Sequence, residues 1–192
     1  MFHDDKLVHE LNLQYKLYPS HYKTTPVSIG RPVAYIGRDE DFGSINILVP
    51  ECRRIRLEQL GELSPNHLVV AGSGLEDEDG QLEMALQDYV RRGGRLLLLE
   101  QHHLSLGQLT ISRQDFIRAH AGSYDHPILQ GLDDDDLMYW DEKIREDGPP
   151  PIIHAAFEKP IKGSFNMILE CSAGDFGDGG DLWSPLLEYR DG

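Results

Sequence analysis

The stretch that decides the fold is residues 68–100, LVVAGSGLEDEDGQLEMALQDYVRRGGRLLLLE. It opens with an apolar run at 68–71 and closes with a second at 96–99. Apolar runs without polar alternation are typical of strands that are buried on both faces. The sequence therefore predicts two buried strands, one at each end of this stretch.

The residues between these two runs have the pattern of a helix over 79–92. Acidic residues at 76–79 precede it, an apolar face runs through it, and Arg91 and Arg92 close it. This charge order complements the helix dipole, and the glycine pair at 93–94 permits a left-handed cap. Two strands joined by a helix through such short links predict a parallel pair.

A third apolar run, Val33–Gly37, lies upstream and ends in glycine. The apolar residues between 45 and 63 roughly follow helical spacing, so a second helix is expected there, with Pro50 in its first turn or lead-in. The predicted fold class is therefore α/β with a mostly parallel central sheet. Its best-defined part covers residues 33–100.

The N-terminal segment has a different pattern. From Leu7 to Leu17 every second residue is apolar or aromatic except His9, which predicts a half-buried antiparallel strand. No neighbouring segment offers a hairpin partner, and one strand cannot stabilise itself. We therefore expect residues 1–25 to be an extension left over from a preceding domain, and residues 26–192 to form the α/β domain.

The C-terminal half contains three more strand candidates, at 152–157, 167–171 and 186–190. An aspartate run at 133–136 is expected to cap and open a short helix. The chain stops at Asp191-Gly192, a hairpin-turn signal, so we expect the domain to be truncated at its C-terminal hairpin.

Composition limits the partners. The chain has 33 acidic and 18 basic residues and a net charge of −15, which repels nucleic acid. No apolar run reaches the ~20 residues that a membrane helix needs, and no signal peptide is recognisable, so a cytoplasmic location is the default expectation. Cys52 and Cys171 are expected to be buried apolar side chains rather than a disulfide.

The loop after the third apolar run, Glu100–His103, is the candidate site at the carboxyl end of the sheet. It contains Glu100, Gln101, His102 and His103. The loop lacks a cysteine or a Gly-x-Ser-x-Gly elbow, so no catalytic nucleophile is predicted. Adjacent histidines point in different directions, so no metal site is predicted either.

The sequence also contains a glycine-rich turn that could bind phosphate and aromatic residues that could stack on a sugar. The Gly72-Ser73-Gly74 turn resembles part of a phosphate-binding fingerprint, but Asp77 stands where the third glycine belongs, and its acidic neighbours repel phosphate. No cofactor is therefore expected. Tyr139, Trp140 and Trp183 are candidate platforms for sugar stacking, with burial in the core as the alternative.

Several motifs together resemble a known superfamily. Residues 68–100 are similar to the class I glutamine-amidotransferase-like superfamily. The later motifs resemble the amidotransferase-like domain found late in large bacterial glycoside hydrolases of the family 2 type, and residues 11–22 resemble the last strand of the preceding immunoglobulin-like domain. These later motifs are HPILQGL at 126–132, DLMYW at 136–140 and WSPLLEY at 183–189.

This resemblance implies a flavodoxin-like three-layer fold and a parent enzyme with β-galactosidase-like or β-mannosidase-like activity, whose catalytic carboxylates lie on a separate barrel. The amidotransferase cysteine would fall near Gln101 or His102 and is absent, so no catalytic residue is carried over. The expected role is a non-catalytic accessory domain that packs on other domains of the parent, shapes a cleft or mediates oligomerisation. The alternatives are a stand-alone hydrolase, for instance of the trehalose-utilisation type, that uses Glu100, His102 and His103 with a metal, and a carbohydrate-binding module.

Overall fold

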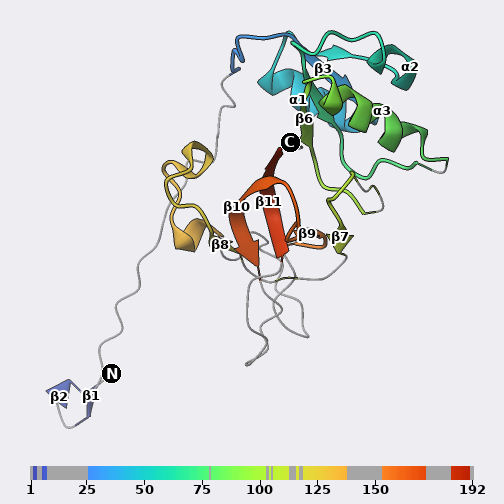
Figure 1. Ribbon diagram of the computed structural model, residues 1–192. Helices are drawn as coiled ribbons and strands as arrows, with labels where there is room; N and C mark the ends of the chain where they lie inside the picture. Colours follow the sequence, from blue (N-terminus) through green and yellow to red (C-terminus); the bar gives the residue numbers. More distant parts are fainter. Residues whose placement is uncertain are drawn as a thin grey trace.

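A computed structural model of the chain describes residues 2–3, 6–7, 26–77, 79–102, 104, 106–112, 116, 119–137, 153–171 and 183–190. The described residues form a parallel sheet flanked by helices and a separate antiparallel sheet, which lies below the parallel sheet in Figure 1. The α/β class predicted from the sequence is therefore confirmed.

The parallel sheet has four strands in the order β4-β3-β5-β6. These are β3 (Val33–Ile36), β4 (Arg53–Arg54), β5 (Leu68–Ala71) and β6 (Arg95–Leu98). All three pairings are parallel. The three apolar runs of the sequence are thus adjacent strands, as predicted, and β4 adds an edge strand that the sequence pattern did not indicate.

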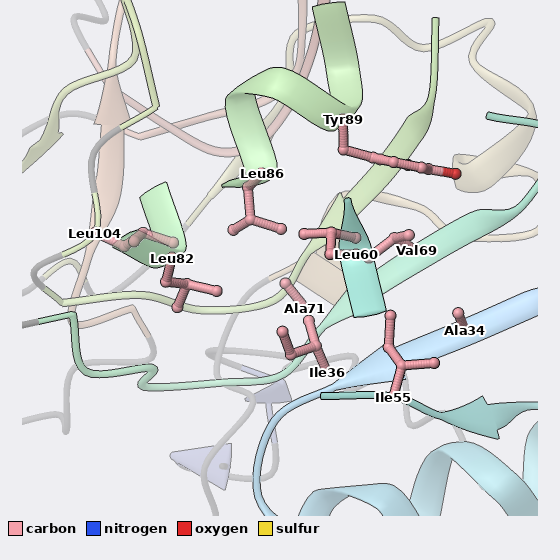
Figure 2. Close-up of a cluster of buried hydrophobic side chains, with 10 residues drawn as sticks. All are labelled: Ala34, Ile36, Ile55, Leu60, Val69, Ala71, Leu82, Leu86, Tyr89 and Leu104. Carbon is pink, nitrogen blue, oxygen red and sulfur yellow. The ribbon is translucent and has the colours of Figure 1, made fainter. Parts of the chain in front are cut away.

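Helices cover both faces of this sheet. On one face α1 (Asp39–Leu48) packs Phe42 and Ile45 against a cluster that contains Val33, Tyr35 and Val70. On the other face α2 (Leu57–Leu60) and α3 (Gln81–Arg91) cover a larger cluster, which Figure 2 shows. This larger cluster consists of Ala34, Ile36, Ile55, Leu60, Val69, Ala71, Leu82, Leu86, Tyr89 and Leu104. Alternate residues of β3 and β5 face opposite helices, which explains why these strands are apolar throughout.

The helix predicted over 79–92 is confirmed as α3. The Asp77 carboxylate accepts hydrogen bonds from the backbone N–H groups of Leu82 (3.1 Å) and Glu83 (2.7 Å), so it satisfies donors that the first turn leaves open. The helix ends where Gly93 adopts a φ of +89°, the left-handed conformation that glycine adopts at low cost.

The prediction of a single helix between residues 45 and 63 is wrong. Helix α1 begins earlier, at Asp39, and ends at Leu48; β4 and the short α2 follow. Pro50 explains the end of α1, because proline lacks a backbone donor and disfavours a helical conformation in the residue before it. Arg53 and Arg54 then pair with Ala34 and Tyr35 of β3. The apolar residues of this region pack on the sheet from separate short elements.

The antiparallel sheet is a correction to the expectation of one mostly parallel sheet, which holds only for residues 33–98. Its five strands have the order β7-β9-β11-β10-β8. They are β7 (Ile111–Ser112), β8 (His120–Ala121), β9 (Ala156–Glu158), β10 (Ser164–Cys171) and β11 (Trp183–Arg190). The strand candidates at 167–171 and 186–190 are confirmed as parts of β10 and β11, and the candidate at 152–157 overlaps β9 at residues 156–157. A third apolar cluster, which includes Phe116, Leu129 and Ile168, packs on this sheet.

Two 3-10 turns lie beside the antiparallel sheet, η1 (Pro127–Leu129) and η2 (Asp134–Leu137). The second confirms that the aspartate run at 133–136 opens a short helical turn, although the turn lies mostly within the run itself. The Asp133 carboxylate accepts from the Asp136 N–H (3.3 Å), and the Asp136 carboxylate accepts from the Asp133 N–H (2.9 Å). No helix in the described part of the chain is long and apolar enough to cross a membrane.

At the N-terminus β1 (Phe2–His3) pairs antiparallel with β2 (Lys6–Leu7). Within the described residues this small hairpin joins neither sheet. The strand predicted over 7–17 lies outside the described residues beyond Leu7. The division at residue 25 therefore stays a prediction.

Candidate functional site

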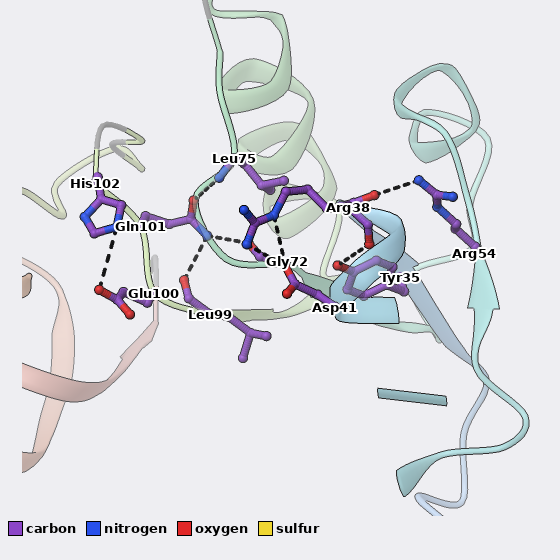
Figure 3. Close-up of polar contacts among 11 residues, drawn as sticks. Tyr35, Arg38, Asp41, Arg54, Gly72, Leu75, Leu99, Glu100, Gln101 and His102 are labelled. Atoms are coloured by element: carbon purple, nitrogen blue, oxygen red, sulfur yellow. Dashed lines mark hydrogen bonds and ion pairs between the residues drawn. The ribbon is translucent and has the colours of Figure 1, made fainter. Parts of the chain in front are cut away.

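The carboxyl ends of β3, β5 and β6 meet at one edge of the parallel sheet. From β3 the chain passes to β4 on one side, and from β4 it crosses to β5 on the other side, so the strand order reverses between β3 and β5. In open α/β sheets ligands bind in the crevice beyond such a reversal. Figure 3 shows the polar contacts at this edge.

The side chain of Tyr35 occupies the reversal point. Its hydroxyl donates to the Arg38 carbonyl oxygen at 3.1 Å. A Cβ atom added at Gly72 would lie 2.3 Å from this hydroxyl oxygen, and one added at Gly37 would lie 2.5 Å from it. Glycine is favoured at both strand ends because the tyrosine hydroxyl lies where a larger residue would place its Cβ atom. Burial raises the pKa of Tyr35, and the nearby Asp41 carboxylate raises it further.

The arginines at this edge are engaged by neighbouring groups. Arg54 donates to the Gly37 carbonyl oxygen at 2.9 Å and forms an ion pair with Asp39. Arg38 pairs with Asp41 at 3.2 Å. These carboxylates neutralise the two guanidinium groups, which leaves little positive charge to attract an anion.

Gln101 stands directly beyond β6 and links it to the loop after β5. It is only 3% exposed. Its amide nitrogen donates to the carbonyl oxygens of Gly72 (2.6 Å) and Leu99 (2.8 Å), and its amide oxygen accepts from the Leu75 N–H at 2.9 Å. Both amide hydrogens are used, so Gln101 has a structural role here: it fixes the shape of the crevice.

Glu100 and His102 flank Gln101 and reach solvent. The His102 Nε2 lies 3.7 Å from a Glu100 carboxylate oxygen, and the two side chains are 35% and 51% exposed. His103 lies outside the described residues. Among the residues that the structure describes, no group of three His, Cys, Asp or Glu side chains is arranged to hold a metal ion.

A groove of about 200 Å³ opens beside Glu100, between the end of β6 and the antiparallel sheet. It is lined by Leu98–Gln101 from the parallel sheet and by residues of β7, β9 and β11, including Ile111, Phe157 and Pro185. His154, just before β9, completes its rim. Sequence reasoning found Glu100 and Gln101 but missed the others, because nothing in the sequence indicates that residues 111, 154–157 and 185 converge on β6.

Of the three aromatic candidates for sugar stacking, the structure describes Trp183. Trp183 lies at the start of β11, where its ring packs on that of Phe116 with 5.6 Å between centroids. Tyr139 and Trp140 lie outside the described residues. The role of Trp183 as a sugar platform stays a prediction, and one side of its ring is already in contact with Phe116.

The cysteines are both buried and form no disulfide, as predicted. Cys52 lies in the cluster under α1, where burial raises the pKa of its thiol. Cys171 ends β10, with its sulfur 3.7 Å from the Trp183 carbonyl oxygen. Neither thiol stands at the carboxyl edge of the parallel sheet beside Glu100 and His102.

Comparisons with protein-family models, with curated proteins and with solved structures gave no match to this chain. The function must therefore be argued from the residues and their geometry.

Proposed function

We propose that this chain is a non-catalytic accessory domain of a carbohydrate-acting glycoside hydrolase. In this role it packs on other domains of the parent enzyme, shapes a cleft or mediates oligomerisation. The catalytic carboxylates belong to a separate barrel of the parent.

The fold supports this proposal. Numbered along the chain, the parallel strands have the order 2-1-3-4, which agrees with the first four strands of the flavodoxin-like order 2-1-3-4-5. Helices on both faces agree with a three-layer arrangement. We therefore propose a flavodoxin-like core, to which the antiparallel sheet is added.

The observation that carries the proposal is that the Gln101 side chain is buried and fully hydrogen-bonded. In the amidotransferase-like superfamily that this chain resembles, the nucleophilic cysteine would stand near this position. Here a buried amide is fixed there by three hydrogen bonds, two from its nitrogen and one to its oxygen. An amide is not a nucleophile, and its rigid placement serves packing rather than turnover.

A stand-alone hydrolase is the second candidate. Only the Glu100–His102 contact favours it, because a carboxylate beside an imidazole suits proton transfer. A metal-dependent version would need His103 or another ligand in addition to these two.

Two measurements test the proposal. We expect the DNA that flanks the coding sequence to encode a barrel domain, in the same reading frame or in an adjacent one. We also expect the purified chain to leave nitrophenyl β-galactoside and β-mannoside intact. Turnover that follows the protein through purification and disappears in Glu100→Gln would overturn the proposal.

A further inference from the structure

We propose that the groove between β6 and the antiparallel sheet binds a neutral sugar ring. This inference rests on the proposed function in one respect, the choice of carbohydrate as the ligand class. The remaining steps follow from the lining of the groove.

Much of the groove lining is apolar and only partly buried. Leu98, Ile111, Phe157 and Pro185 line it, and each is of intermediate exposure. The free energy falls when a ligand displaces water from apolar surface of this kind, so this surface favours binding. The C–H face of a sugar ring is a suitable partner, and the lining contains the aromatic ring of Phe157.

The lining also includes two residues, here called the rim residues, whose side chains can form hydrogen bonds with hydroxyls. Glu100 offers carboxylate oxygens as acceptors, and the His154 imidazole can donate or accept. Both side chains belong to exposed residues that line the groove. Gln101 also borders the groove, but its amide hydrogens already bond backbone carbonyls, so it supports the site without contacting a hydroxyl.

Charge and size argue against other ligand classes. Among the described residues no Lys or Arg lines the groove, whereas Glu100 does. Because the chain also carries a net charge of −15, we expect phosphates and carboxylates to be repelled. A wholly apolar ligand would displace water from the Glu100 carboxylate and offer it no hydrogen bond in return. The volume of about 200 Å³ lies below the ~300–1,000 Å³ of sites for drug-sized ligands, which suits a single ring.

The backbone around Phe157 is well supported. Phe157 pairs with Ile111 of β7 on one side and with Ser184 of β11 on the other. The Ser184 hydroxyl in turn donates to the Leu169 carbonyl oxygen. A ring carried on a strand with partners on both sides keeps its position when a ligand arrives.

The test is a titration of the full chain with galactose, mannose and their β-linked disaccharides. Binding is followed by isothermal calorimetry and by ¹H–¹⁵N chemical shifts. We expect saturable binding of at least one sugar with a Kd on the order of 1 mM, and the largest shifts at residues 154–157. Galactose 6-phosphate should bind at least about tenfold more weakly than galactose, because its charge faces Glu100.

Variants locate the binding to the groove. Glu100→Ala and His154→Ala should each weaken binding about tenfold or more, because each removes a hydrogen-bonding group from the rim. Glu62→Ala, which removes an exposed carboxylate beyond α2, is the matched control and should leave the Kd unchanged. Circular dichroism confirms that each variant is folded.

The outcomes separate the two proposals. Absence of saturation up to about 100 mM of every sugar, or binding that neither rim variant weakens, overturns the groove inference. A flanking barrel sequence found together with no sugar binding leaves the accessory role standing. If the chain binds sugar but its flanking DNA encodes no barrel, the inference that the groove binds sugar is supported and the accessory role is contradicted.

Discussion

The side-chain amide nitrogen of Gln101 lies 2.6 Å from the carbonyl oxygen of Gly72, and this contact ties β6 to the loop after β5. The two residues lie beyond the carboxyl ends of the neighbouring strands β5 and β6, at the edge of the sheet where ligands bind in α/β proteins. The geometry of that edge therefore depends on one buried amide.

Gln101→Ala should lower the free energy of unfolding by about 2–4 kcal/mol, because it removes three hydrogen bonds and leaves buried backbone groups without partners. Urea unfolding followed by circular dichroism measures the change. Gln108→Ala, at an exposed turn position, is the control and should change stability by less than about 0.5 kcal/mol. Equal effects of the two substitutions would show that the Gln101 contacts contribute nothing.

Gly72→Ala should destabilise the fold by about 1–3 kcal/mol, because the new methyl group would lie 2.3 Å from the Tyr35 hydroxyl oxygen. Combining it with Tyr35→Phe should recover part of this loss, since the hydroxyl is the closest atom. A double-mutant cycle measures the coupling, and strictly additive effects would contradict the close approach.

Gly43→Ala is the contrasting glycine substitution. Gly43 lies inside α1, and a Cβ atom there meets nothing within 4 Å. Alanine should therefore stabilise the fold by about 0.5–1 kcal/mol, since it lowers the entropy of the unfolded chain and favours the helix. Thermal unfolding monitored at 222 nm checks the sign, and a lower melting temperature would be the contrary result.

Stability should fall as the pH rises above about 10. Burial raises the pKa of Tyr35 and of Tyr89 above the ordinary value of 10.0 in the folded state, so the folded chain holds these protons longer than the unfolded chain. The stabilisation is complete below pH 10 and is lost as the pH rises toward the folded pKa values. Tyr35→Phe and Tyr89→Phe should each flatten the alkaline decline in urea titrations, and an unchanged slope in both would contradict the assignment.

Neither cysteine should react rapidly at neutral pH. Both are buried, and burial raises the pKa of the Cys52 thiol, which lowers its thiolate fraction. Iodoacetamide should label both sites slowly in buffer and quickly in urea, and the chain should release no ammonia from glutamine. Rapid stoichiometric labelling of one native cysteine together with loss of an activity would falsify this prediction.

Deletion of residues 1–25 should lower the melting temperature by less than about 8 °C, which corresponds to roughly 2 kcal/mol in a domain of this size. Within the described residues the β1–β2 hairpin joins neither sheet, which agrees with a separate N-terminal unit. Scanning calorimetry of the full and shortened chains makes the comparison. A larger decrease would show that the segment is integral to the domain.

The sequence by itself determined the parallel core. The three apolar runs had to be covered on both faces, and the charge order and glycines around α3 left little choice about where that helix starts and stops. Local signals were weaker between 45 and 63. There the helical spacing of apolar residues concealed a helix, a short strand and a second helix, each of which packs on the sheet.

Only the tertiary structure decided the site. The sequence placed Glu100 and Gln101 at a strand end. The folded chain showed that the buried Gln101 side chain links β6 to the loop after β5, and that the Tyr35 hydroxyl packs against Gly37 and Gly72. It also brought His154, Phe157 and Pro185 beside β6 to form the groove. The physical reason is range: strand and helix patterns arise from neighbours a few residues apart, whereas a groove forms from side chains that packing alone brings together.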